Sequence, residues 1–149
     1  MIKADDLYTL IWMSRPLMQA AETLAEQGLA GTGLTVRTRA VLEILHKHGD
    51  ASVPQIADRL DIKRQYVQLM INDTLAEGLT EQRPNSRHKR SSLIALTPRG
   101  AELIERVIAR EHATVEALGE PFDTADIATA LDVIQRVTSA LKNRSREQQ

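Results

Sequence analysis

Several residue types are absent or scarce in this chain of 149 residues, and each absence narrows the range of functions. There is no cysteine, which excludes disulfides, thiol-based redox sensing and any zinc site with cysteine ligands. The aromatic residues are one Trp, two Tyr and one Phe, too few for a large pocket lined by aromatic rings. No apolar run approaches the roughly 20 residues that a bilayer-spanning helix needs. The N-terminal residues are acidic, unlike a signal peptide, so we expect a cytoplasmic protein.

An excess of basic charge is also missing, because the net charge is −1. The charge is nevertheless unevenly distributed. Residues 63–90 contain six Lys or Arg and three Asp or Glu, which gives +3 there and leaves −4 for the remainder. A local basic patch on a neutral body is what binding to a phosphate backbone requires, although basic residues are also common on exposed hairpin tips.

The sequence offers little for catalysis or metal binding. It has no glycine-rich phosphate loop, and the predicted layout gathers no Ser, His and Asp into one set. His46 and His48 lie two residues apart on a predicted helix and therefore point to different faces, so a metal would need a further ligand such as His112 or a carboxylate. Ordinary surface histidines are the better interpretation. We expect no enzyme, no metal site and no cofactor.

The apolar spacing predicts a mainly α fold with one small β-hairpin (α+β). Thr35 and Ser52 are predicted N-caps, and Gln55 completes a capping box with Ser52. Pro16 predicts a kink inside the first helix, and the polar residues 142–149 are expected to fray. The predicted helices span 5–27, 36–48, 53–60, 63–77, 98–118 and 124–141, and the predicted strands span 79–83 and 92–96, with Leu93 and Leu96 docked on the core.

The helices over 53–60 and 63–77 with a tight turn between them form a helix-turn-helix, and the hairpin makes it a winged helix. The exposed face of the second helix is predicted to carry Arg64, Gln65, Gln68 and Asn72. Gln and Asn can bind adenine through two hydrogen bonds, and Arg can bind guanine in the same way. A polar face is ordinary on a surface helix, but this one lacks the Glu/Lys pairs typical of a solvated face. Its residues therefore favour reading of base edges.

The hairpin tip is the second candidate contact with nucleic acid. It contains no acid and can reach phosphates or an adjacent narrow minor groove. The predicted DNA-binding residues are Lys63, Arg64, Gln65, Gln68, Asn72, Arg83, Arg87, His88, Lys89 and Arg90.

The sequence resembles the MarR family of winged-helix transcription regulators. The resemblance is carried by four motifs: Arg64-Gln-x-Val67-Gln68, Leu75-x-x-Gly78-Leu79, Arg83-Pro-Asn-x-x-His88-Lys89-Arg90-Ser91 and Leu96-Thr-x-x-Gly100. It covers nearly the whole chain and implies a single MarR-like domain over 1–149, with a DNA-binding lobe at 34–98 and dimerisation helices at 5–27 and 98–142.

The resemblance further implies a homodimer in which each recognition helix enters a major groove. Arg90 would insert beside the wing, and the operator would be a pseudo-palindrome with half-sites roughly 10–10.5 bp apart. Four residues depart from the family pattern. Lys63 stands where many members have a Ser or Thr cap, and Leu69 stands where this branch often has a basic residue. Pro54 and Tyr66 are also unusual, and Tyr66 could donate to a phosphate or simply cover the turn. The DNA sequence that this protein prefers therefore cannot be inferred from the sequences that its relatives bind.

Many members of this family bind small molecules between the dimerisation helices and the DNA-binding lobe. The candidate ligand-binding residues by this analogy cluster near Pro16: Tyr8, Trp12, Met13 and Arg15. The alternative is that Trp12 and Met13 belong to the dimer core and Arg15 to a surface ion pair, and the scarcity of aromatic residues favours it.

The leading hypothesis is a dimeric, sequence-specific DNA-binding transcription regulator, a repressor more than an activator, which a small ligand could release from DNA. The alternative is a protein-interaction module that has kept the winged-helix scaffold without reading DNA, since a fold does not fix a function. The basic tip argues against that alternative. A ligand- or metal-sensing enzyme relic ranks last.

Overall fold

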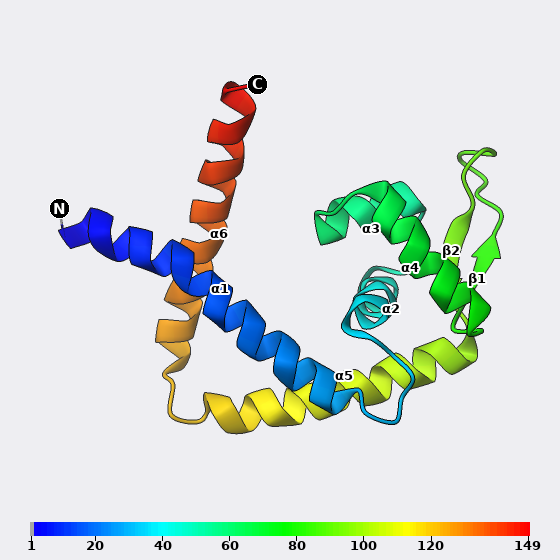
Figure 1. Cartoon of the computed structure of the whole chain (residues 1–149), viewed down its shortest axis with the longest axis horizontal. Helices are drawn as coiled ribbons and strands as arrows, with labels where there is room; N and C mark the ends of the chain where they lie inside the picture. Colours follow the sequence, from blue (N-terminus) through cyan, green and yellow to red (C-terminus); the bar gives the residue numbers. More distant parts are fainter. Residues whose placement is uncertain (1) are drawn as a thin grey trace. The chain divides into compact units, whose positions relative to one another are not determined.

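The computed structural model describes residues 2–149 and confirms a mainly α fold with one small antiparallel sheet (Figure 1). The elements are α1 (Ile2–Gly28), α2 (Val36–His48), α3 (Val53–Leu60), α4 (Arg64–Ala76), β1 (Thr80–Arg83), β2 (Leu93–Leu96), α5 (Pro98–Gly119) and α6 (Thr124–Glu147). They form two compact units. One contains the residues up to Gln19 together with Ala113–Gln149, and the other is Ala20–His112, called the lobe below.

The predicted caps at the starts of α2 and α3 are present. The Thr35 side chain accepts a hydrogen bond from the amide of Thr38, whose hydroxyl accepts one from the Thr35 amide. Ser52 and Gln55 form the same reciprocal pair at α3, at 2.9 and 3.4 Å. Each box satisfies amides that the first helical turn leaves without partners. The sequence therefore fixes locally where the two helices preceding α4 begin.

The turn between α3 and α4 is short because Asp61 adopts the left-handed conformation, with φ 56° and ψ 44°. Its amide donates to the Ala57 carbonyl and closes α3. Helix α4 then begins at Arg64, one residue later than predicted, and Lys63 is its N-cap without a side-chain capping hydrogen bond. This start of α4 therefore lacks the 1 kcal/mol or so that a Ser, Thr or Asp cap typically contributes.

The hairpin pairs β1 with β2 in antiparallel register, Thr80 opposite Leu96 and Arg83 opposite Leu93. Ala51, just before α3, pairs with Ile94 of β2 as an isolated antiparallel bridge. Its amide donates to the Ile94 carbonyl at 3.1 Å, and the Ile94 amide donates back at 2.7 Å. The wing is thereby attached to the helix-turn-helix through backbone bonds.

The core of the lobe consists of two buried apolar clusters. The first lies among α2, α3, α4 and β2 and includes Val41, Ile56, Ile71 and Ile94. The second joins α2, and Leu79 just before β1, to the first half of α5, with Leu42, Leu79 and Ile104 fully or almost fully buried. Arg39 on α2 also forms ion pairs with Glu43 and with Glu111 on α5. The hydrogen bond with Glu111, partly shielded from solvent, raises the pKa of Arg39.

Two predictions about particular segments were wrong. Helix α6 continues to Glu147, where fraying from residue 142 was expected. Arg144 and Arg146 lie in its last turn, where positive charge interacts favourably with the negative end of the helix dipole. In β2, Ile94 and Ala95 are buried, and the partly covered Leu96 packs against both core clusters as predicted, whereas the partly covered Leu93 belongs to neither.

Helix α1 also differs from its predicted form at the start, because it begins at Ile2. It remains helical through Pro16, at which a kink was predicted. Proline removes one backbone donor there without ending the helix. No helix within residues 2–149 is both long and apolar enough to cross a membrane.

Candidate nucleic-acid interface

Helix α4 presents the predicted polar face to solvent. Val67, Ile71 and Thr74 are buried and anchor the helix in the lobe. The side chains of Arg64, Gln65, Gln68 and Asn72 are all exposed. Their exposure follows from the helical period, which places them away from the buried positions. The structure therefore brings the four predicted reading residues onto one element.

Two of these residues are hydrogen-bonded to each other. The amide nitrogen Nε2 of Gln68 donates to Oδ1 of Asn72 at 2.9 Å, across one turn of α4. This bond uses neither Oε1 of Gln68 nor the amino group of Asn72. The pair thus presents an acceptor and a donor in a fixed relation, the combination that the major-groove edge of adenine matches.

The exposed part of α4 also contains two residues outside the predicted set. Tyr66 is 52% exposed and Leu69 is 61% exposed. The sequence interpretation treated them as departures from a family pattern because it searched this helix for polar side chains. The helical spacing alone would have located them, since Leu69 is two residues from both Val67 and Ile71.

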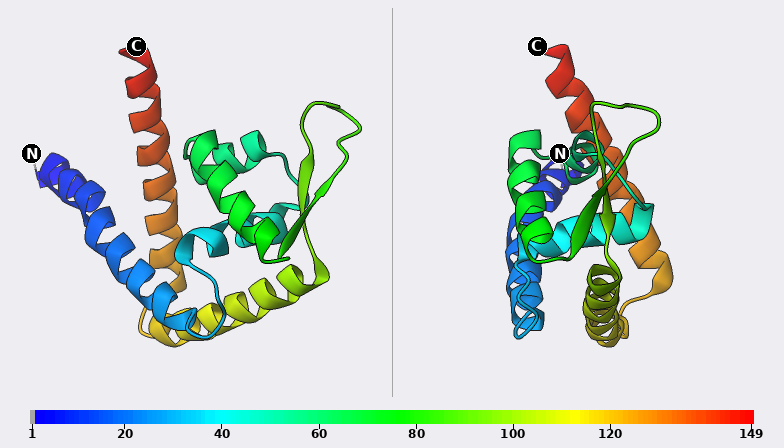
Figure 2. Two further views of the ribbon diagram at one scale, coloured as in Figure 1. Left: turned by 45° about the vertical axis from the view of Figure 1, so that its right-hand side comes forward. Right: turned by 90° about the vertical axis from the view of Figure 1, so that its right-hand side faces the viewer.

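The tip of the wing, residues 84–92, stands clear of the helices of the lobe (Figure 2). Asn85 accepts a hydrogen bond from the Arg87 amide at 3.1 Å, and the Ser91 amide donates to the His88 carbonyl at 3.2 Å. The side chains of Arg87, His88, Lys89 and Arg90 are exposed. Within residues 2–149 none of these side chains forms an ion pair, so their charges are available to a partner.

Arg83 differs from the other basic residues of the predicted site. It stands at the end of β1, and its guanidinium contacts Glu81 at 2.8 Å and Asp50 at 3.1 Å. The hydrogen bond with Glu81, helped by the charge of Asp50, raises the pKa of Arg83. The structure thus places Arg83 at the end of β1, where the tip begins, and its charge is balanced there by two acids.

The C-terminal end of α4 is held by the residues that open α5. The Thr97 hydroxyl donates to the Gly78 carbonyl at 2.7 Å, and the Arg99 guanidinium donates to the Glu77 carbonyl at 3.0 Å. The last carbonyls of a helix otherwise lack hydrogen-bond partners, and a cation at this end interacts favourably with the helix dipole. These contacts fix α4 relative to the hairpin and α5.

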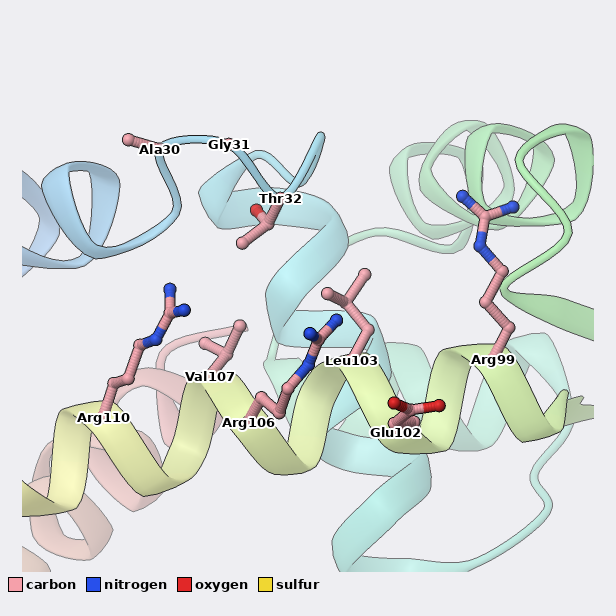
Figure 3. A pocket seen from close by; sticks show the side chains of 9 residues that line it. All are labelled: Ala30, Gly31, Thr32, Arg99, Glu102, Leu103, Arg106, Val107 and Arg110. Atoms are coloured by element: carbon pink, nitrogen blue, oxygen red, sulfur yellow. The ribbon is translucent and has the colours of Figure 1, made fainter.

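A cavity of about 250 Å³ lies between the α1–α2 loop and α5 (Figure 3). It contains none of the predicted site residues. Arg106 and Arg110 project from α5 toward the loop, and Glu102 adds one acid. The lining residues are Ala30, Gly31, Thr32, Arg99, Glu102, Leu103, Arg106, Val107 and Arg110. Only the spacing of the three arginines along one helix could have indicated this polar cavity from the sequence.

The four candidate ligand-binding residues lie on α1 and are exposed, and Tyr8, Trp12 and Arg15 share one side of the helix. The Tyr8 and Trp12 ring centroids are 6.3 Å apart at an interplanar angle of 59°, and the Arg15 guanidinium lies 5.4 Å from the Trp12 ring centroid. Tyr8, Trp12 and Met13 are 66%, 52% and 58% exposed. These side chains are therefore not part of an enclosed apolar pocket of their own unit.

The histidines show a surface arrangement. Nε2 of His46 lies 3.6 Å from a Glu105 carboxylate oxygen, and Nδ1 of His48 lies 2.9 Å from an Arg59 nitrogen. Partial desolvation and the neighbouring charges of Arg59 and Lys47 lower the pKa of His48. In the part of the chain that the structure describes, no three His, Asp or Glu side chains are grouped as a metal site would require.

Comparison with known proteins decides the family. The family model described as "MarR family" matches residues 32–91. The HTH-type transcriptional repressor MdtR of Bacillus subtilis is 30% identical over 114 residues, which cover 76% of this chain and 74% of MdtR. The chain belongs to the MarR family. Members of this family are transcription regulators and not enzymes, in agreement with the sequence prediction.

The solved and curated MarR relatives extend this comparison. The crystal structure of the MarR family transcription regulator SP03579 is 32% identical with a TM-score of 0.85, and the match covers 97% of this chain and 96% of that one. An uncharacterized protein of Mycobacterium tuberculosis is 35% identical over 91 residues, or 61% of this chain. The match spans 64% of the length of that mycobacterial protein.

Proposed function

We propose that this MarR-family protein is a homodimeric transcription repressor that reads a pseudo-palindromic DNA operator. The observation that supports this function is the combination, in one lobe, of two features. The exposed face of α4 carries Arg64, Gln65, Gln68 and Asn72, and the wing tip carries basic side chains that form no ion pair within residues 2–149.

The two features divide the work of recognition. The α4 side chains would read base edges in a major groove, with Gln68 and Asn72 acting as one unit because of their mutual hydrogen bond. Arg87, Lys89 and Arg90 at the tip, with Lys63 and His88, would bind phosphates or enter the neighbouring minor groove. Phosphate contacts set the register and affinity, and base contacts set the sequence.

The dimer is supported by the unit that contains α6. No residue of α6 is buried, yet Ile127, Leu131, Ile134 and Leu141 follow one another at spacings of 4, 3 and 7 residues along one stripe. An unpartnered apolar stripe of this length calls for a second surface, which a two-fold symmetric copy provides. Two lobes would then meet half-sites about one helical turn apart.

Repression is supported by the relationship to MdtR, a named repressor that is 30% identical. A small ligand that binds one lobe arrangement better than the other would release the operator. Tyr8, Trp12, Met13 and Arg15 remain the residues predicted to contact it.

The test begins with selection of the bound sequence from a random pool of double-stranded DNA. The recovered motif should contain two inverted half-sites roughly 10–10.5 bp apart. Binding to this operator is then titrated against salt for wild type and for Arg90→Ala. Loss of one phosphate contact per protomer should weaken binding to every sequence and reduce the salt slope by about one per protomer.

Gln68→Ala provides the contrasting variant. It should weaken binding by roughly 1–3 kcal/mol at one base position and leave the salt slope unchanged. If neither variant alters a gel-shift titration, the assigned DNA interface is wrong. Affinity that does not respond to salt, or the absence of affinity, would support the protein-interaction module.

A further inference from the structure

Leu69 occupies the middle of the exposed side of α4. It is the sixth residue of the helix, in the half that a recognition helix usually directs at base edges. It lies two residues from both Val67 and Ile71, which are buried, so the period of 3.6 residues per turn places it on the opposite side from the core. Gln65 lies one turn before it and Asn72 one turn after it.

The exposure of one leucine is ordinary on a protein surface and decides nothing by itself. The significance of Leu69 follows from its neighbours on α4, and this inference rests on the proposed function. If Gln65 and Asn72 face base edges, the 61%-exposed Leu69 between them must face the same groove. Any base opposite Leu69 then loses water and gains no hydrogen bond from it.

The four base pairs differ in what this loss of water costs. Guanine, cytosine and adenine present only hydrogen-bonding groups in the major groove, whereas thymine also presents its C5-methyl group. Burying a polar edge against a leucine leaves that edge without a partner, which is unfavourable. Contact with a methyl group removes apolar surface from water, which is favourable.

We propose that Leu69 is a specificity-determining residue that recognises the C5-methyl group of one thymine in each half-site. Leu69 is then part of the reading face although its side chain is apolar. The recognised group is the methyl, so the preference differs in kind from that set by Arg64 or Gln68.

The experiment uses the full-length protein and the operator selected as described above. Each thymine is replaced singly by uracil, which removes the methyl group and keeps the hydrogen-bonding edge. For wild type, one uracil position per half-site should weaken binding about fourfold, the factor that corresponds to about 0.8 kcal/mol for one buried methyl group. Uracil at the other positions, and outside the half-sites, serves as the DNA control.

Leu69→Ala should bind the thymine operator more weakly than wild type and should lose nothing further on the uracil substitution. Such non-additivity identifies a direct contact. Leu69→Met, which keeps an apolar side chain of similar reach, should retain the discrimination. The side chain is exposed, so both variants should unfold like wild type, and circular dichroism during heating verifies this.

The outcomes separate this inference from the proposed function. A half-site without a selected thymine, or uracil penalties equally large in wild type and Leu69→Ala, overturns the role of Leu69 while sequence-specific binding stands. Failure of the wild type to enrich any sequence overturns both. A penalty that disappears in Leu69→Ala and persists in Leu69→Met establishes the contact.

Discussion

Gly100 shows at the scale of one residue why a position in the family motif must be glycine. A Cβ atom built there would lie 2.0 Å from the carbonyl oxygen of Leu79 and 2.9 Å from its carbonyl carbon. Those are backbone atoms, which cannot move aside as the end of a flexible side chain can. The first turn of α5 therefore approaches the start of β1 more closely than any other residue would allow.

Replacement of Gly100 by alanine should destabilise the lobe by at least about 2 kcal/mol, because the overpacked backbone must shift. Denaturation by urea measures the change. Gly28→Ala is the matched control, since nothing lies within 4 Å of its Cβ position and alanine favours a helix. A loss of stability no larger than that of the control would show that α5 can move away from Leu79 without cost.

A second residue-scale feature is the buried pair of Thr74 on α4 and Thr80 on β1. The Thr74 hydroxyl donates to the Ile71 carbonyl at 2.9 Å and lies 2.8 Å from the Thr80 hydroxyl, which must then donate to it. Thr74 is fully buried and Thr80 is 3% exposed. The pair links the proposed recognition helix to the wing.

Thr74→Val should destabilise the protein by about 1–3 kcal/mol, because it leaves the buried Thr80 hydroxyl without a partner. The double variant Thr74→Val/Thr80→Val removes both polar groups and should lie closer to wild type than the sum of the single changes. Unfolding midpoints of the four proteins give the coupling. Strictly additive effects would mean that the two hydroxyls do not depend on each other.

At the scale of elements, the wing contains two kinds of arginine that the sequence does not distinguish. Arg87 is in the tip and forms no ion pair with the residues that the structure describes, whereas Arg83 is held by Glu81 and Asp50. Contacts between exposed charges of this sort contribute little to stability. Their effect on DNA binding is larger in principle, because a neutralised arginine displaces fewer counterions from the phosphates.

Arg87→Ala should therefore reduce the salt slope of operator binding by about one per protomer, and Arg83→Ala should leave it close to wild type. Fluorescence anisotropy at several salt concentrations measures both slopes. Asp50→Asn tests the reason directly, since removal of one acid should free Arg83 and steepen the slope. Equal losses in Arg83→Ala and Arg87→Ala would show that Arg83 leaves its acids to bind DNA.

The same scale shows what could be predicted and what could not. The starts of α2 and α3 were predictable because their capping boxes involve residues three apart. The polar face of α4 was predictable from helical period. The pairing of Arg83 with Asp50 joins residues 33 apart in sequence, and that of Arg39 with Glu111 joins residues 72 apart. Such contacts depend on packing, which no local pattern specifies.

At the scale of the whole molecule, the unit containing α6 leaves large apolar side chains exposed to solvent. Leu131 is 56% exposed and Ile134 is 47% exposed, on a helix without a buried residue. A monomer rarely exposes so many large apolar side chains in one contiguous patch. This surface is the physical argument for the proposed dimer, and it can be tested separately from DNA binding.

Leu131→Glu/Ile134→Glu should raise the dimer dissociation constant about a hundredfold or more, because association would bury carboxylates without partners. Sedimentation equilibrium measures the constant, and operator affinity should fall with it since one lobe alone meets only one half-site. Thr129→Glu adds one carboxylate two residues from both Ile127 and Leu131, on the opposite side of α6, and should leave the dimer intact. If the double variant remains dimeric at the concentrations at which the wild type is dimeric, the interface lies elsewhere. The apolar stripe on α6 would then need another partner.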